Sequence, residues 1–135
     1  MSGLVVVSEN GQGRYQQEVR AGQHRLIADE PAEMGGNDAG PAPFDFLMSG
    51  LGACTSMTLR MYAERKELPL TGISVELQHE KIEIDGSKRD QISRSIRLDG
   101  PLNDEQRQRM LEIAGKCPVH RAISGSILLP CKLAE

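Results

Sequence analysis

Three cysteines, Cys54, Cys117 and Cys131, are the residues of this chain best suited to chemistry. The sequence has no apolar run of the roughly 18 residues that span a membrane, and its first residues do not form a signal peptide. We therefore expect a cytosolic protein. In a reducing cytosol, cysteines are more often free, catalytic or redox-active than joined in structural disulfides.

Cys131 fits the simplest interpretation of a cysteine, a small apolar residue of the core. It alternates with Ile127, Leu129 and Leu133 in a predicted terminal strand, where Pro130 indicates an edge position.

Cys54 and Cys117 have different contexts. Cys54 lies in the middle of a helical pattern, whereas Cys117 precedes Pro118, and proline is favoured at the first position of a helix. Cys117 is therefore predicted to cap a short helical turn, whose positive end would lower the pKa of its thiol. Both cysteines should face one core, but the sequence alone does not establish that they approach within disulfide distance. Cys54 would need activation from elsewhere, such as an arginine.

His120 opens two further possibilities for the Cys117-Pro-Val-His120 stretch. The spacing suits half of a zinc site, but Cys54 with His79 or His24 would have to complete it from scattered positions. His120 is also a candidate general base for a cysteine hydrolase, although no nucleophile elbow accompanies it. The scattered positions of the other ligands argue against a metal site.

The element that must position Cys54 is a long helix, predicted from about Phe44 to Arg65 and introduced by Pro43. Its predicted buried face carries Cys54 and consists of Phe44, Leu47, Met48, Leu51, Thr58, Leu59 and Tyr62.

The other elements form runs of strands on either side of this helix. A three-stranded meander is predicted over Leu4–Val7, about Arg14–Arg20 and His24–Ala28, with a hairpin turn at Asn10-Gly11, followed by a Gly- and Pro-rich loop over residues 31–43. A strand from Ile73 to His79, a bulge near Glu80-Lys81, a second strand through Ile92, Ile96 and Leu98, a helix starting at Asn103 or Asp104 and the terminal strand complete the chain. The order β-β-β-α-β-β-α-β predicts an α+β fold, a mostly antiparallel sheet packed on two helices.

Length and charge narrow the function. A chain of 135 residues suits one domain, 1–135. A net charge of −3 and the absence of Trp argue against nucleic-acid binding, which favours excess basic residues and aromatic rings.

Two motifs together resemble one known family. They are Gly40-Pro-Ala-Pro43-Phe-Asp-Phe-Leu47 leading to Leu51-Gly-Ala-Cys54-Thr-Ser-Met-Thr-Leu-Arg-Met-Tyr62-Ala, and Cys117-Pro-Val-His120 about sixty residues later. This combination is similar to the OsmC/Ohr family of thiol-dependent peroxidases, and the predicted order of elements agrees over nearly the full chain.

The resemblance implies an intertwined homodimer with active sites between the subunits. Cys54 would attack an organic hydroperoxide and become a sulfenic acid, which Cys117 would resolve as a disulfide. An external thiol such as a lipoyl group would then reduce that disulfide, and the resemblance implies neither a metal nor a bound cofactor.

The resemblance also implies an arginine from the N-terminal hairpin and a carboxylate near the start of the long helix. Arg14 is the best match to the family's arginine position, with Arg20 and Arg25 as alternatives. Asp45 stands where the family has the longer glutamate. A first-turn helix acid is an almost equally good interpretation of Asp45. Two other functions stay open, a cysteine hydrolase using His120 and a protein that binds a small apolar ligand without catalysis.

Overall fold

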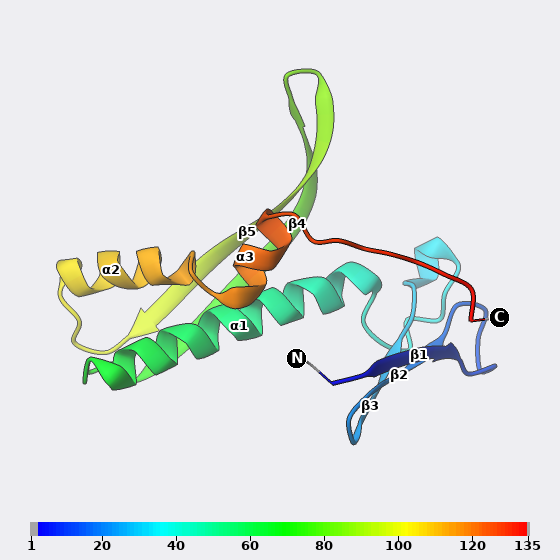
Figure 1. The fold of residues 1–135 in the computed structure, drawn as a ribbon, viewed down its shortest axis with the longest axis horizontal. Coiled ribbons are helices and arrows are strands. Elements are labelled where there is room, and N and C mark those ends of the chain that lie inside the picture. The colour runs from blue at the N-terminus through cyan, green and yellow to red at the C-terminus, as the bar shows by residue number, and fades with distance from the viewer. Residues whose placement is uncertain (1–2, 135) are drawn as a thin grey trace. The chain divides into compact units, whose positions relative to one another are not determined.

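The computed structural model describes residues 3–134 and is a mixed α+β structure with two antiparallel sheets (Figure 1). The chain forms two compact units, one ending at Leu47 and one beginning at Met48. The predicted fold class is confirmed, and each unit is described below by itself.

The first unit contains the predicted meander. Its strands are β1 (Val5–Glu9), β2 (Gln17–Ala21) and β3 (His24–Ala28), paired antiparallel in the order β1-β2-β3. The Asn10-Gly11 pair does not form a two-residue hairpin turn, because Glu9 pairs with Gln17 and leaves residues 10–16 as a wider loop. Arg14 therefore lies in this loop and not in β2.

Asp29 organises the Gly- and Pro-rich segment that follows β3 and contains the short 3₁₀ helix η1 (Ala32–Met34). Its buried carboxylate accepts hydrogen bonds from the backbone N–H groups of Glu30, Asn37 and Ala39 at 2.8, 3.1 and 3.1 Å. These bonds hold the pKa of Asp29 below its ordinary value, with the Ala39 N–H as the largest contribution. The segment is thus an ordered loop closed on one buried charge.

The long helix α1 (Pro43–Arg65) has the bounds that the sequence predicts to within one residue. Its buried residues are Leu51, Gly52, Thr55, Leu59 and Ala63. The predicted face is therefore right at Leu51 and Leu59 and wrong at Phe44 and Leu47, which are exposed, while Cys54 is half-buried at its margin. The helix lies close to the sheet at Gly52, where an added Cβ would lie 2.7 Å from Leu77 Cδ1.

The second sheet is a long hairpin of β4 (Gly72–Ile84) and β5 (Ser87–Asp99). The predicted bulge near Glu80 and Lys81 is wrong, because these residues pair one to one with Gln91 and Asp90 in an unbroken register. The change of apolar phase at Ile82 instead moves apolar side chains to the other face of the hairpin, in the part that extends past the helices in Figure 1.

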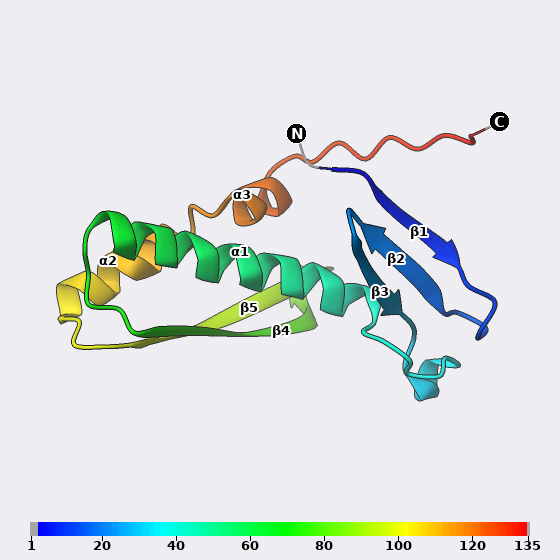
Figure 2. The ribbon, with the colours of Figure 1, turned by 90° about the horizontal axis from the view of Figure 1, so that it is seen from below.

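Two helices follow the hairpin, α2 (Asp104–Ala114) and α3 (Pro118–Ser124). Asn103 caps α2 and forms a reciprocal capping box with Gln106. Figure 2 shows α1 and α2 on the same face of the β4–β5 hairpin. The core between them consists of Leu59, Ala63, Leu70, Leu102, Met110, Ile113 and Ala114.

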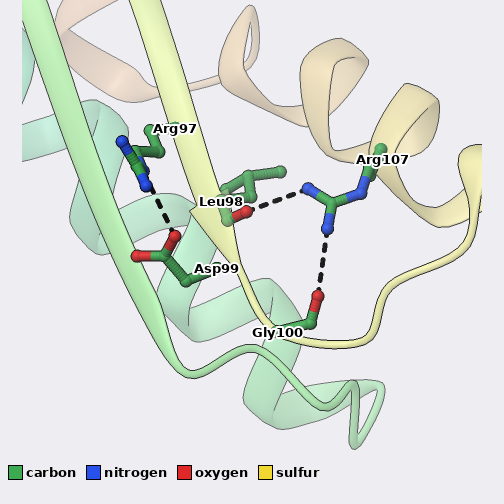
Figure 3. A network of polar contacts seen from close by, with 5 residues as sticks. All are labelled: Arg97, Leu98, Asp99, Gly100 and Arg107. Atoms are coloured by element: carbon green, nitrogen blue, oxygen red, sulfur yellow. Dashed lines mark hydrogen bonds and ion pairs between the residues drawn. The ribbon is translucent and has the colours of Figure 1, made fainter.

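Arg107 joins α2 to the end of β5. Its guanidinium donates to the carbonyl oxygens of Leu98 at 2.9 Å and Gly100 at 3.0 Å, while Arg97 pairs with Asp99 on the exposed face of the strand (Figure 3). These hydrogen bonds hold α2 against the end of β5. Cys117 follows shortly after α2, so they also help to set its position.

The predicted terminal strand is wrong for this chain. Residues 125–134 are exposed and form no strand, because they pair with no edge strand of either sheet. Cys131 is therefore an exposed residue and not part of the core. Within residues 3–134, none of the helices combines the length and apolar character needed to cross a membrane.

Candidate active site

Cys54 and Cys117 meet inside the second unit. Cys54 lies on α1, and Cys117 is the N-cap of α3, as the Cys-Pro pair predicts, with Pro118 at the first helical position. Both thiols are free, Cys54 half-buried and Cys117 fully buried. The Cys54 side chain lies near that of Cys117 and contributes to lowering the pKa of the Cys117 thiol. The tertiary structure thus brings together two thiols that lie far apart in the sequence.

Polar groups from two helices surround the Cys117 sulfur. The backbone N–H of His120 donates to Sγ at 3.3 Å, closing the first turn of α3. The Thr55 hydroxyl lies 3.9 Å from the same sulfur, one residue along α1 from Cys54. Thr55 is fully buried, and its one hydroxyl proton is donated to the Leu51 carbonyl oxygen at 2.7 Å. These contacts place one backbone N–H donor and one hydroxyl oxygen beside a sulfur that solvent does not reach.

Arg94 on β5 adds a positive charge to this group. Its Nη1 donates to Thr55 Oγ1 at 2.8 Å and to the Ala114 carbonyl oxygen at 3.3 Å, and its Nη2 donates to His120 Nδ1 at 2.5 Å. One guanidinium therefore joins β5 to α1, α2 and α3. Because Arg has no acceptor, His120 Nδ1 must accept, which leaves the ring proton of the neutral imidazole on Nε2.

These surroundings change the acidity of Cys117. Burial by itself raises the pKa of the thiol. The hydrogen bond from the His120 N–H, the neighbouring Cys54 and Thr55 side chains and the charge of Arg94 together lower the pKa by more than burial raises it. The pKa of Cys117 consequently lies below its ordinary value, which favours the thiolate that redox chemistry uses.

Arg14 and Asp45 belong to the unit that ends at Leu47, whereas the two cysteines belong to the other. Arg14 is exposed and stacks on the ring of Tyr15, 4.9 Å from its centroid. Asp45 accepts a hydrogen bond from the Ala42 N–H at 3.0 Å, the contact of a first-turn acid at the start of α1. The catalytic roles of Arg14 and Asp45 stay predictions, as do the alternatives Arg20 and Arg25.

Sequence reasoning missed Arg94 and Thr55. Arg94 shares the parity of Ile92, Ile96 and Leu98, so its side chain lies on the half-buried face of β5 among apolar residues. An arginine that interrupts an apolar alternation is a signal that the sequence does contain. Thr55 follows Cys54 directly, but nothing in its own context indicates full burial beside a second cysteine.

The zinc alternative finds no cluster to support it in the part of the chain that the structure describes. Residues 3–134 contain no group of three His, Cys, Asp or Glu side chains placed to hold one metal ion. His79 instead contacts Asp90 on the hairpin at 2.8 Å.

Fold and site together define a class: an α+β domain in which a long helix and a helix N-cap present two free, adjacent thiols. The model of the OsmC-like protein family matches residues 35–130, and the chain belongs to this family.

Solved structures agree on the fold. The OsmC-like protein of Mycoplasma pneumoniae is 18% identical, with a TM-score of 0.77 over 93% of this chain and 89% of that one. The organic hydroperoxide resistance protein OsmC of Legionella pneumophila is 20% identical, with a TM-score of 0.68 over 90% of each chain. An organic hydroperoxide resistance protein of Elizabethkingia anophelis is 18% identical, with a TM-score of 0.67 over 93% and 91%. No curated protein matches the chain in sequence.

Proposed function

We propose that this protein is a thiol-dependent peroxidase that reduces organic hydroperoxides through Cys54 and Cys117. The observation that carries the proposal is the proximity of these two free thiols, one half-buried and one buried with a lowered pKa. Two relatives of the same fold are named for organic hydroperoxide resistance, which supports this substrate class.

The different exposure of the two thiols supports different roles for them, Cys54 as the peroxidatic and Cys117 as the resolving cysteine. Cys54 is the one that a substrate reaches, so its thiolate attacks the O–O bond and becomes a sulfenic acid, while the alkoxide leaves and takes up a proton as the alcohol. The Cys117 thiolate then attacks the Cys54 sulfur, forming the disulfide and releasing hydroxide. An external dithiol such as a lipoyl group returns both cysteines to thiols and is itself oxidised to a disulfide. Arg14 and Asp45 are proposed to assist at Cys54.

The proposed working form is a homodimer of a single OsmC-like domain, residues 1–135, in a reducing compartment such as the cytoplasm. Large apolar side chains that one chain leaves exposed support the dimer. They include Val5 and Val7 on β1, Met57 and Met61 on α1, and Leu128, Leu129 and Leu133 near the C-terminus. Light scattering coupled to size-exclusion chromatography should give twice the mass of 14.8 kDa.

The decisive experiment follows consumption of cumene hydroperoxide and counts free thiols before and after one equivalent of peroxide. The parent should lose two thiols per chain and recover them with dihydrolipoamide. Cys54→Ser should lose peroxidase activity by at least about a hundredfold, since removing a covalent nucleophile removes the reaction path. Cys117→Ser should still react once and hold a sulfenic acid that dimedone traps.

Cys131→Ser is the matched control, because Cys131 is exposed and distant in sequence from both motifs. It should retain the parent rate. If Cys54→Ser consumes hydroperoxide as fast as the parent, the proposal is wrong. Hydrolysis of an activated ester that persists in Cys117→Ser and disappears in His120→Ala would instead favour the hydrolase.

A further inference from the structure

Arg94 is a cation in a place that the fold otherwise gives to apolar side chains. It occupies an inward position of β5, between Ile92 and Ile96, and is half-buried. A charge that leaves water loses solvation energy unless polar or oppositely charged groups replace the water. The partners of Arg94 therefore indicate what its position serves.

The partners of Arg94 are all neutral. They are Thr55 Oγ1, the Ala114 carbonyl oxygen and His120 Nδ1. Among residues 3–134, Arg94 forms no ion pair with a carboxylate, whereas Arg20, Arg97 and Arg109 each do. A half-buried guanidinium held by neutral acceptors is a site prepared for an anion.

Cys117 is the group beside it that can supply the negative charge. Its sulfur touches two of the residues that Arg94 holds, the Thr55 hydroxyl at 3.9 Å and the backbone N–H of His120 at 3.3 Å. Arg94 also acts on Cys117 directly through its charge. The titratable or charged groups around this sulfur are Cys54 from α1, Arg94 from β5 and His120 from α3.

We propose that Arg94 is a positioning residue for the resolving step: its positive charge and its hold on Thr55 and His120 keep the buried Cys117 sulfur placed to attack oxidised Cys54. This inference rests on the proposed peroxidase function. The Cys117 thiolate donates its electron pair to the Cys54 sulfur of the sulfenic acid, the S–S bond forms as the S–O bond breaks, and hydroxide leaves to be protonated by water. No further oxidant takes part, because the hydroperoxide has already oxidised Cys54.

Burial separates this role from activation of the peroxide. Cys117 is fully buried, so hydroperoxide reaches Cys54 first, and Arg94 acts on the thiol that reacts second. Loss of Arg94 should consequently slow disulfide formation much more than sulfenic acid formation. A purely structural role would slow both steps or neither.

The test measures the Cys117 thiolate without any peroxide. The proteins carry Cys54→Ser and Cys131→Ser, so that Cys117 is the remaining cysteine. The ultraviolet absorbance of its thiolate is measured as a function of pH in the parent with Arg94, in Arg94→Gln and in Arg94→Lys. Arg94→Gln should move the titration to higher pH by about one unit or more, which is about tenfold less thiolate at a fixed lower pH. Arg94→Lys should stay closer to the parent because it keeps the charge.

The matched control is Arg97→Gln on the outer face of the same strand, where Arg97 pairs with exposed Asp99. It should titrate like the parent. Equal titrations of parent, Arg94→Gln and Arg94→Lys overturn the inference. Circular dichroism shows whether Arg94→Gln folds. If it does not fold, Arg94→Lys alone decides: a Cys117 titration in Arg94→Lys that lies at the pH of an unfolded thiol also overturns the inference.

A second measurement in the full-cysteine protein follows one turnover with tert-butyl hydroperoxide. Dimedone trapping reports the sulfenic acid, and loss of the second thiol reports the disulfide. Arg94→Lys should form the disulfide several-fold more slowly with an unchanged first step, since the two-pronged hold on Thr55 and His120 is lost. An unchanged rate of disulfide formation contradicts the inference. The two proposals can fail separately. If Arg94→Gln shifts the thiolate titration but the parent consumes no hydroperoxide, the effect of Arg94 on the acidity of Cys117 stands and the proposed peroxidase function is wrong.

Discussion

Arg94 Nη2 donates to His120 Nδ1 across 2.5 Å, which joins strand β5 to helix α3 and assigns the ring proton of the neutral imidazole to Nε2. A ring nitrogen that accepts from a guanidinium does not take a proton from a thiol. The contact therefore makes His120 a support for Arg94 rather than a base that faces Cys117 through Nδ1.

Replacing His120 separates these two roles. His120→Asn keeps a short acceptor for Arg94, whereas His120→Ala removes it. We expect His120→Asn to form the Cys54–Cys117 disulfide within a few-fold of the parent rate and His120→Ala to slow it by about tenfold. Stopped-flow measurement of disulfide formation checks this, and equal losses in both variants would indicate a general base.

Thr55→Val tests the hydroxyl that lies between Arg94 and Cys117. The change keeps the shape of a fully buried side chain but leaves one Arg94 donor without its acceptor. We expect the free energy of unfolding to fall by about 1–3 kcal/mol, the usual cost of an unsatisfied buried polar group. Urea denaturation measures it. Thr55→Ser is the control, because it keeps the hydroxyl and loses a methyl group, and the idea fails if Ser costs more than Val.

Gly50 and Gly52 offer a matched pair on α1 close to Cys54. An added Cβ meets nothing within 4 Å at Gly50, but lies 2.7 Å from Leu77 Cδ1 at Gly52. Gly50→Ala should stabilise the protein by up to about 1 kcal/mol through helix propensity. Gly52→Ala should lose that gain, because Leu77 must move. Thermal unfolding of both variants checks the difference, and equal stabilisation would show that α1 does not press on β4 there.

The lowered pKa of Asp29 predicts that the free energy of unfolding falls at acidic pH. Its pKa is lower in the folded state than in the unfolded chain, so its stabilisation is complete above the unfolded pKa and is lost as the pH falls through the folded pKa. Asp29→Asn should flatten this acid loss of stability, measured by urea denaturation over a series of acidic pH values. Asp38→Asn is the control, since Asp38 is exposed at φ 54°, a conformation that Asn tolerates. A slope unchanged in Asp29→Asn would contradict the assignment.

Local patterns were sufficient for several elements of the fold. The apolar spacing and Pro43 predict α1, the Cys117-Pro118 pair predicts the cap of α3, and Asn103 predicts the start of α2. These features depend on residues within a turn or two of one another. The sequence therefore contains their physical cause in one place.

Features that depend on partners distant in the chain could not be predicted in the same way. The register of β4 and β5 stays unbroken where the apolar phase changes, because backbone pairing continues while the outer hairpin leaves the helices. Residues 127–133 alternate like a strand, yet form none, because a strand requires a neighbour to pair with.

The sequence by itself determined the two cysteine motifs, the long helix that carries Cys54 and the cap position of Cys117. The tertiary structure alone decided that the two thiols meet and that Arg94 is the cation beside them. The reason is physical: acidity and contact depend on charges and burial within a few ångströms, and here β5 supplies that charge from residues that no local pattern connects to either cysteine.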